Sequence, residues 1–348
     1  MKIVHILKSN KYSGAENVAI TIINKMKDRN DIVYVCPEGE IREYLKKYNI
    51  NYEPVKKISV KEIKRIIKKY KPDIVHAHDF SASVISAIAS NRKNVISHLH
   101  NNNPRMKKIN LYSIIYLCST LKYKKILMVS QAIMDEYVFR KNIAKNVEIL
   151  GNPIELEKIV KLSKEYKCDE LYHIAFLGRL SDPKQPEKFI QLIKELKETI
   201  KNIKAVMIGD GPLREKCEKI IKENDLEKNI ILKGFIKNPF PILKNSKVVC
   251  MTSKYEGFGL AAIEALVLGK PVVATDVGGL PDIVNDTCGK IYKEIEEAKK
   301  EVIKLLDNEE YYKSKSLNAI KRSQEMNNID EYINKLEKIY KQCIGKGE

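Results

Sequence analysis

The sequence predicts an α/β protein of two domains, each built on a sheet of parallel strands. Its 348 residues exceed the usual size of one domain. Short apolar runs alternate with helical patterns along the chain, and this series begins again after a charged segment near residue 155. Such runs are typical of strands that are buried on both faces, as in parallel sheets. We therefore expect two open sheets covered by helices, with ligands bound beyond the carboxyl ends of the strands, in a cleft between the domains.

The first domain is expected to span residues 1–152. Its predicted strands are Ile3–Leu7, Ile32–Cys36, Asp73–Ala77, Val95–Leu99 and Ile126–Val129. Apolar side chains recur at helical spacing from Val18 to Met26 and from Val60 to Tyr70, and a further helix is expected to start at Ser130. The turn-forming segment Gly151-Asn-Pro153 then ends the series.

The second domain is expected to span residues 153–328, and it opens with a charged linker over roughly residues 155–170. Its predicted strands are His173–Leu177, Ala205–Ile208, Ile230–Leu232, Val248–Met251 and Pro271–Ala274. We expect helices between these strands. The last segment, Ile329–Ile344, is predicted to be a helix because its apolar side chains share one face.

The net charge of +18 is distributed unevenly. Residues 1–150 hold 28 Lys and Arg against 13 Asp and Glu, whereas residues 151–348 hold 35 against 32. The basic first half therefore favours an anionic partner, such as a membrane surface or an anionic acceptor. We expect no nucleic-acid partner, because Trp is absent and no zinc-finger, helix-turn-helix or RNA-binding signature is present.

Several other classes of protein are not favoured. The seven cysteines are scattered and form no Cys-x-x-Cys pair, which argues against a zinc ribbon or a disulfide framework. The N-terminus does not resemble a signal peptide, and no stretch of about 18 apolar residues is present. The sequence thus predicts a cytoplasmic protein that could be peripheral on the inner face of the cell membrane.

The densest group of functional signals lies in residues 251–264. A predicted strand runs into a loop with Gly257, Phe258 and Gly259, and a helix begins at about Leu260. The free backbone N–H groups of a helix N-terminus form a site for an anion. Glu256 and Glu264 lie on either side of this turn, and carboxylates accept hydrogen bonds from paired sugar hydroxyls. The segment therefore predicts a site for a phosphorylated sugar compound.

Two further motifs follow strands of the second domain. Arg179 and Lys184 come after the strand at His173–Leu177, and both cations suit a diphosphate. Gly209 and Gly211 form a Gly-Asp-Gly turn after the next strand. A dinucleotide fingerprint would need a third glycine where Arg214 stands, so a hydride-transferring enzyme is not favoured.

In the first domain, Gly14 follows the first strand, where its backbone could approach a phosphate or a sugar. Four of the six histidines lie near the ends of predicted strands: His76, His78, His98 and His100. We expect only one of the last two, His100 by preference and His98 otherwise, to face the binding site. No carboxylate motif accompanies them, so we expect no metal site.

Together these motifs resemble the retaining glycosyltransferases of the GT-B fold, group 1 (family 4). The resemblance rests on Glu256-x7-Glu264 around Gly-Phe-Gly, on Gly178-Arg-Leu180 with Lys184, and on Gly209-Asp-Gly-Pro-Leu213. Gly14-Ala15, Pro72-Asp-Ile-Val-His-Ala-His78 and Gly151-Asn-Pro153 also fit, so it covers essentially the whole chain. It implies two Rossmann-like domains, with the C-terminal helix, residues 329–345, packing back on the first.

The resemblance also implies roles for the residues. Glu256, His100, Arg179 and Lys184 would be catalytic, with Arg179 and Lys184 neutralising the leaving phosphate. Residues that would bind the donor are Gly14, Gly209, Gly211, Gly257, Phe258, Gly259, Leu260 and Glu264. The donor would be a UDP- or GDP-linked sugar, and neither a cofactor nor a metal is expected.

The first domain would bind the acceptor, a glycan or a lipid-linked sugar in cell-surface polysaccharide synthesis. Two basic surfaces are candidates for contact with an anionic membrane, residues 61–71 and residues 104–125. The second of these could equally be a core helix with solvated ends. The alternatives for function are a sugar-nucleotide epimerase of related fold and a non-catalytic module that binds sugar nucleotides.

Overall fold

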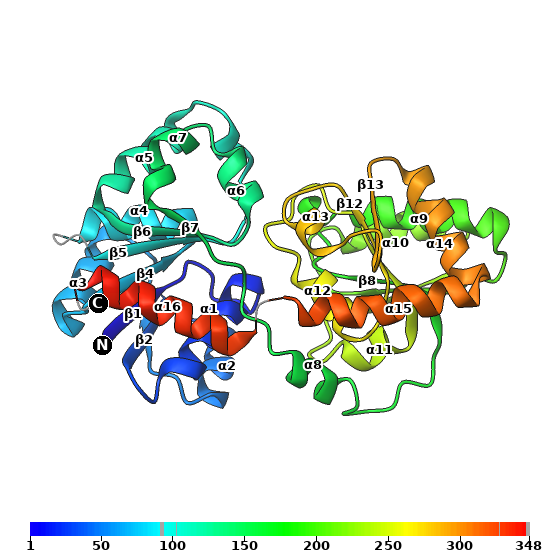
Figure 1. The fold of residues 1–348 in the computed structure, drawn as a ribbon, viewed down its shortest axis with the longest axis horizontal. Helices are drawn as coiled ribbons and strands as arrows, with labels where there is room; N and C mark the ends of the chain where they lie inside the picture. The colour runs from blue at the N-terminus through cyan, green and yellow to red at the C-terminus, as the bar shows by residue number, and fades with distance from the viewer. Residues whose placement is uncertain (91–93, 102, 327, 346–348) are drawn as a thin grey trace. The chain divides into compact units, whose positions relative to one another are not determined.

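The computed structural model describes residues 1–90, 94–101, 103–326 and 328–345. The chain forms two compact units (Figure 1). Unit 1 is Met1–Pro153 with the C-terminal segment Asn327–Glu348, and unit 2 is Ile154–Met326. Each unit is a single sheet of parallel strands with helices in the connections, which is the Rossmann-like arrangement.

The sheet of unit 1 has seven parallel strands in the order β3-β2-β1-β4-β5-β6-β7. Its strands are β1 Lys2–Ile6, β2 Asp31–Pro37, β3 Tyr52–Val55, β4 Ile74–His78, β5 Val95–Leu99, β6 Tyr123–Met128 and β7 Val147–Ile149. The central strands β1, β4 and β5 are almost wholly buried. The carboxyl ends of these three strands therefore meet at one edge of the sheet, where a ligand site is expected.

The connections of unit 1 are mostly helical. Its helices are α1 Gly14–Met26, α2 Ile41–Lys47, α3 Val60–Tyr70, α4 Asp79–Ala89, α5 Leu111–Ser119, α6 Gln131–Glu136 and α7 Arg140–Ile143. Helix α16, Ile329–Cys343, packs against α1 and buries Tyr332, Leu336 and Tyr340. An ion pair of 3.1 Å between Arg29, in the turn after α1, and Glu337 of α16 also holds this helix in place. The end of the chain thus completes the core of unit 1.

The sheet of unit 2 has six parallel strands in the order β10-β9-β8-β11-β12-β13. Its strands are β8 Tyr172–Leu177, β9 Ala205–Ile208, β10 Ile230–Gly234, β11 Ser246–Met251, β12 Val272–Thr275 and β13 Gly289–Tyr292. Its helices are α8 Leu156–Leu162, α9 Pro186–Thr199, α10 Arg214–Glu223, α11 Phe240–Lys244, α12 Leu260–Val267, α13 Leu280–Ile283, α14 Ile295–Asp307 and α15 Glu309–Gln324.

Alternate residues of the unit 2 strands enter two separate apolar cores. Val249 and Met251 pack in one core with residues of α8, α11, α12, α13 and α15. Val248 and Cys250 pack in the other core with residues of α9, α10 and α14. Because successive side chains of a strand point to opposite faces, the sheet is covered by helices on both faces. This explains the continuous apolar runs in the sequence.

The predicted strands agree with the structure to within a few residues, but three strands were missed. These are β3, β7 and β13, each of which lies at the edge of a sheet and has partly exposed side chains. An edge strand has one free side, so its sequence carries no long apolar run. The charged linker predicted over residues 155–170 was also wrong in part, because residues 156–162 form helix α8.

Candidate functional site

In unit 2, three loops meet at the carboxyl ends of β8, β9 and β11. Gly178-Arg-Leu180 follows β8, Gly209-Asp-Gly211 follows β9, and residues 252–259 follow β11. Backbone hydrogen bonds join the first two loops, since the Gly178 amide donates to Ile208 and the Leu180 amide to Asp210, both at 3.0 Å. The predicted donor-binding motifs of this unit therefore form one continuous surface.

Two glycines make the contact between these loops possible. A Cβ atom at Gly209 would lie 2.0 Å from the carbonyl oxygen of Gly178, and one at Gly211 would lie 2.3 Å from that of Leu180. Gly209 also has a φ of +138°. Any side chain at either position would push the loops apart. The glycines thus act by allowing close backbone packing, which places Arg179 beside the turn.

Lys184 and Glu256 form an ion pair, although they are 72 residues apart in the sequence. The short helix η4, Asp182–Lys184, is fixed to the loop after β11. The Lys254 amide donates to the Pro183 carbonyl at 2.8 Å, and the Thr252 hydroxyl donates to the Lys184 carbonyl at 3.1 Å. The side chains of Lys184 and Glu256 are 24% and 12% exposed, so the pair is largely shielded from water.

The loop before α12 is also held by glycines. Gly259 is the N-terminal cap of α12 with a φ of +105°, a conformation that L side chains rarely adopt. Gly278 has a φ of +57°, and a Cβ atom there would lie 1.6 Å from the carbonyl oxygen of Glu256. The amide of Gly279 donates to that oxygen at 3.3 Å. The turn at Gly278 and Gly279 therefore sets the position of Glu256.

Glu264 lies in the second turn of α12, and its side chain is half-buried. Burial raises the pKa of its carboxyl to about 7, and the charge of Lys184 acts in the opposite direction. Near neutral pH this side chain can therefore either accept or donate a hydrogen bond. Arg179, in contrast, is exposed, and no carboxylate in the described residues pairs with it. Its guanidinium is available to an anion at this edge of the sheet.

Unit 1 has a cavity of about 480 Å³ at the carboxyl ends of β1, β4 and β5. Residues of those strand ends and of the segments after them line it, including Ser9, His78, Asp79 and Asn101. Gly14 begins helix α1 next to Ala15 and Glu16, both of which line the cavity. Burial raises the pKa of Glu16, and the charge of Asp79 acts in the same direction.

The reason for expecting only one of His98 and His100 to face the site was wrong. Residues two apart on a strand lie on the same face, and the two ring centroids are 4.1 Å apart. Both rings are buried, and they join His76 and His78 in one cluster. His100 follows β5 between the lining residues Leu99 and Asn101, but it is not itself among the lining residues.

The sequence interpretation missed two residues of unit 1. His5 lies on β1 opposite His76 in the strand register, so it belongs to the histidine cluster. Asp79 has a φ of +62°, which is uncommon for a residue other than glycine, and its carboxylate accepts from the His100 amide at 3.0 Å. A polar residue directly after a buried central strand is the signal that could have identified Asp79.

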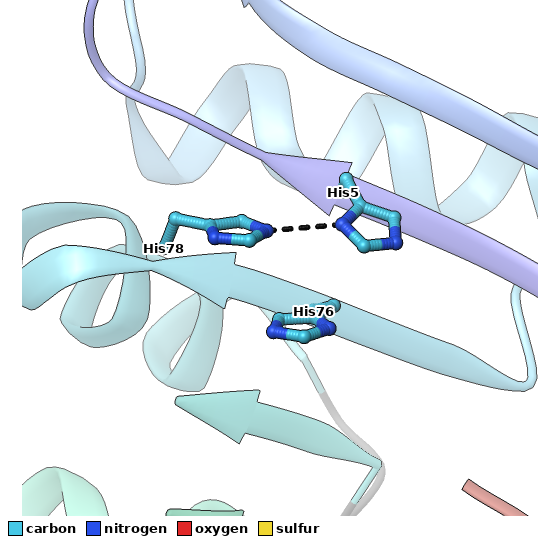
Figure 2. A group of neighbouring side chains, drawn as sticks. All are labelled: His5, His76 and His78. Carbon is cyan, nitrogen blue, oxygen red and sulfur yellow. Dashed lines mark hydrogen bonds between the residues drawn. The ribbon is translucent and has the colours of Figure 1, made fainter. Parts of the chain in front are cut away.

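Two groups of three histidines place one ring nitrogen each within 4.8 Å of one another. The first is His5, His76 and His78 (Figure 2), and the second is His78, His98 and His100. Such spacing is compatible with a transition metal. However, the closest nitrogens approach in pairs at hydrogen-bonding distance. In the described residues no carboxylate hydrogen-bonds to any of these rings. Hydrogen bonding therefore accounts for the close approaches.

Helix α5 and the segments beside it expose large apolar side chains. Ile109, Leu111 and Leu121 are 69%, 74% and 77% exposed, and Ile114 and Ile115 are also exposed. Exposed basic residues lie on both sides of this apolar face: Arg105, Lys107, Lys108, Lys122 and Lys124. Helix α5 also buries Ser113, Tyr116 and Ser119, so it has one face in the core and one exposed apolar face. Across the described residues, no helix combines the length and the apolar character needed to cross a membrane.

Comparison with protein families assigns each part of the chain. Residues 12–158 match the model of Glycosyltransferase Family 4, and residues 157–322 match that of glycosyl transferases group 1. An uncharacterized glycosyltransferase of Methanocaldococcus jannaschii is 31% identical over 239 residues, which are 62% of this chain and 58% of that protein. The poly(ribitol-phosphate) alpha-N-acetylglucosaminyltransferase of Staphylococcus aureus is 29% identical over 153 residues, or 41% of this chain and 30% of that one. The chain therefore spans less than two thirds of these two relatives.

A third relative is similar over most of its length. It is a 41.2 kDa protein of the cps region of Klebsiella pneumoniae, 26% identical over 341 residues, with 88% of this chain and 90% of that one covered. Among solved structures, Anabaena HepE in complex with UDP-glucose has a TM-score of 0.84 at 19% identity, covering 97% of this chain and 98% of that one. S. aureus TarM in complex with UDP has a TM-score of 0.74 at 15% identity, covering 98% of this chain and 100% of that one. The fold, with two family models that together match residues 12–322, shows that the chain belongs to the GT-B glycosyltransferases.

Proposed function

We propose that the protein transfers a hexose-type sugar from a nucleotide-sugar donor to a glycan or lipid-linked acceptor, with retention at the anomeric carbon. The observation that carries the proposal is the ion pair of Lys184 and Glu256 beside the N-terminus of α12. A cation, a carboxylate and a helix N-terminus share one edge of the unit 2 sheet. These groups match the chemistry of a nucleoside diphosphate attached to a sugar.

The negative charge that develops on the leaving diphosphate decides the roles of the cations. Arg179 and Lys184 would stabilise it together with the backbone amides at Gly257–Leu260, because preorganised donors act most strongly where charge develops. The diphosphate would replace Glu256 as the partner of Lys184. Glu256 would then be free to accept hydrogen bonds from hydroxyls of the donor sugar, and Glu264 would bind the ribose.

Retention is proposed without an enzyme nucleophile. The transition state would resemble an oxocarbenium ion, and the acceptor would attack from the side on which the diphosphate leaves. His100 would orient the donor sugar near its 6-position. A UDP-linked donor is supported by the likeness to HepE, whose structure holds UDP-glucose. The relative from the cps region of K. pneumoniae supports a role in cell-surface polysaccharide synthesis.

The acceptor side would belong to unit 1, and α5 would bring it to an anionic membrane surface. An apolar face with basic residues on both sides is the pattern of a helix that lies in a lipid interface. Met106 and Tyr112, which line the unit 1 cavity, belong to the segments that carry the exposed face. A lipid-linked acceptor could therefore enter the cavity from the bilayer side.

The proposal is tested by incubating the protein with a panel of UDP- and GDP-linked sugars, with and without lipid-linked acceptors. Substituting Lys184→Ala or Glu256→Ala should lower transfer about 100-fold or more, since one lost preorganised group costs on that order. Lys216→Ala, which breaks the exposed pair with Glu187, is the matched control and should keep full activity. Donor turnover to an isomer without acceptor would instead indicate an epimerase, and tight donor binding without turnover a binding module.

A further inference from the structure

The ion pair of Lys184 and Glu256 lies across the two elements of unit 2 that are proposed to receive the diphosphate. A Cβ atom at Gly178, in the loop after β8, would lie 3.8 Å from Cδ and Cε of Lys184. A Cβ atom at Gly259, the N-terminal cap of α12, would lie 3.8 Å from Cγ of Glu256. The carboxylate that neutralises Lys184 therefore comes from the turn at which an anion is expected to bind.

The backbone on both sides of this ion pair is held in place by hydrogen bonds. The Pro183 carbonyl accepts a second hydrogen bond from the Tyr255 amide, at 3.3 Å. The Thr252 hydroxyl donates to the Gln185 carbonyl at 2.9 Å. An opening of the ion pair is therefore a rotation of its two side chains, while the loops that carry them stay together.

The two side chains depend on each other for neutralisation. Within the described residues, neither Lys184 nor Glu256 has another ion-pair or hydrogen-bond partner for its charged group. A diphosphate that binds Lys184 must take the place of Glu256, whose carboxylate then lies beside a new anion without a partner. Because both side chains are mostly shielded, water compensates this loss only in part. The protein's own carboxylate therefore opposes the binding of a nucleoside diphosphate alone.

A nucleotide that carries a sugar changes this balance. Hydroxyls of the sugar donate to the released carboxylate of Glu256, and a hydrogen bond to a charged group contributes about tenfold to 100-fold in affinity. The free nucleoside diphosphate has no hydroxyl to offer at this position. The same carboxylate thus opposes the nucleotide and favours the nucleotide sugar.

We propose that Glu256 is a specificity-determining residue that competes with the nucleoside diphosphate for Lys184 and so favours the intact donor over the free nucleotide. This inference rests on the proposed function, which places the diphosphate at Lys184 and the sugar at Glu256. Once the sugar has been transferred, Glu256 returns to Lys184 and promotes release of the nucleoside diphosphate. The ion pair of the free protein is then the state to which each turnover returns.

A second ion pair joins the same two segments and provides a matched control. Lys254, in the loop after β11, lies 3.6 Å from Asp182 of the short helix η4. The two side chains are 46% and 72% exposed, so this pair is open to water. Asp182→Asn therefore removes a negative charge from the same site without removing a shielded competitor. It should change the affinities for nucleotide and nucleotide sugar by the same factor.

The first experiment measures affinities by isothermal titration calorimetry in the absence of an acceptor. Wild type, Glu256→Gln and Asp182→Asn are each titrated with UDP and UDP-glucose, and with GDP and GDP-mannose. Glu256→Gln should bind the free nucleoside diphosphate about tenfold more tightly than the wild type, because the competing charge is gone. The glutamine amide still hydrogen-bonds to sugar hydroxyls, so affinity for the nucleotide sugar should stay within about threefold.

The ratio of the two affinities separates competition from a general effect of charge. In Glu256→Gln the preference for nucleotide sugar over nucleotide should fall about tenfold, whereas Asp182→Asn should keep it within about twofold. Glu264→Gln should also keep the ratio, because the ribose that Glu264 is proposed to bind is present in both ligands. Unchanged or weaker binding of the nucleoside diphosphate by Glu256→Gln overturns the proposal, as does an equal fall of the ratio in Asp182→Asn.

The second experiment needs only the wild type, so it decides even if Glu256→Gln does not fold. Analogues of the bound nucleotide sugar that each lack one sugar hydroxyl are titrated in the same way. At least one analogue should bind about tenfold or more weakly than the parent compound, because it leaves the carboxylate of Glu256 without a partner. A loss of less than about threefold for every analogue overturns the proposal.

The outcomes separate this inference from the proposed function. If nucleotide and nucleotide sugar both bind but Glu256→Gln gains no affinity for the nucleotide, the competition is overturned and the donor site stands. If the predicted gain is found and no acceptor receives a sugar, only the proposed transfer is contradicted. Failure of all four nucleotide compounds to bind overturns the proposed function, and the competition at Lys184 with it.

Discussion

The two units hold the residues at their strand ends by different interactions. In unit 2 the position of Glu256 is set by backbone contacts that only glycine permits, and its carboxylate pairs with Lys184. In unit 1 the corresponding strand ends carry five buried imidazoles that hydrogen-bond to one another and to Tyr340. The first design depends on shape, whereas the second depends on the protonation state of its side chains. The two units should therefore fail under different conditions.

The largest expected difference is in acid. A ring that stays neutral in the folded state while its unfolded pKa is about 6.5 costs roughly 2 kcal/mol at pH 5, because the unfolded chain binds a proton that the folded one does not. Burial lowers the pKa of His5 to about 3, and those of His76, His78 and His98 are lowered as well. Above pH 6.5 these neutral rings cost the folded state no stability. As the pH falls below 6.5, the folded state becomes progressively less stable relative to the unfolded chain. Three or four such rings approach the total stability of a domain, about 5–15 kcal/mol.

Unit 1 should accordingly unfold near pH 5 while unit 2 remains folded. Hydrogen exchange measured by mass spectrometry between pH 7 and pH 5, corrected for the intrinsic rate, follows the two units separately. Peptides from β1, β4 and β5 should lose protection first, and those from β8 and β11 should keep it. Simultaneous loss of protection in both units would contradict the prediction that unit 1 unfolds in acid before unit 2.

A smaller effect should follow from Gly278→Ala in unit 2. The new Cβ would meet the Glu256 carbonyl, and the positive φ adds strain, so a loss of about 2–4 kcal/mol of unfolding free energy is expected. Gly178→Ala is the control, because its Cβ would have only ordinary contacts at 3.7 Å or more and should change stability by about 0.5 kcal/mol or less. Urea unfolding curves compare the two. Equal losses would show that backbone contact at Gly278 is not what holds the loop.

The smallest predicted effect concerns the exposed face of α5. The protein should sediment with vesicles that contain phosphatidylglycerol at low salt, and less with neutral vesicles or at raised salt, since each basic residue near the surface adds about 1 kcal/mol. Leu111→Gln should weaken binding by about 1–2 kcal/mol. Leu171→Gln, equally exposed at 73% but in unit 2, is the control and should have no effect. Equal binding of both variants would contradict docking through α5.

The same contrast explains what could be predicted from the sequence. The unit 2 loops were placed correctly at the ends of their strands because glycine spacing and bracketing glutamates are local patterns. The ion pair of Lys184 and Glu256 was not predicted from the sequence. Lys184 was assigned to the leaving phosphate of the donor and Glu256 to its sugar, so no contact between them was expected. That pairing depends on the hydrogen bonds of Pro183, which are long-range.

The histidine cluster of unit 1 was only partly predicted from the sequence. His76, His78, His98 and His100 were singled out because they lie near the ends of predicted strands. His5 was not, because its place in the cluster depends on the register of β1 with β4. The edge strands β3 and β7 were missed for a related reason: partly exposed strands lack the apolar runs that mark buried ones. Local sequence patterns thus predicted the central strands. The position of His5 opposite His76 depends on strand register, which such patterns do not contain.

The contact between Tyr340 and His76 has a consequence for the order in which the protein is made. The two residues are 264 positions apart, and helix α16 fills the core of unit 1. At synthesis rates of about 5–20 residues per second, the ribosome needs on the order of 13–50 s to pass from one to the other. All of unit 2 emerges within that interval. Unit 1 begins with the first half of the chain but therefore finishes folding last. Until α16 has been made, His76 on β4 lacks its contact with Tyr340.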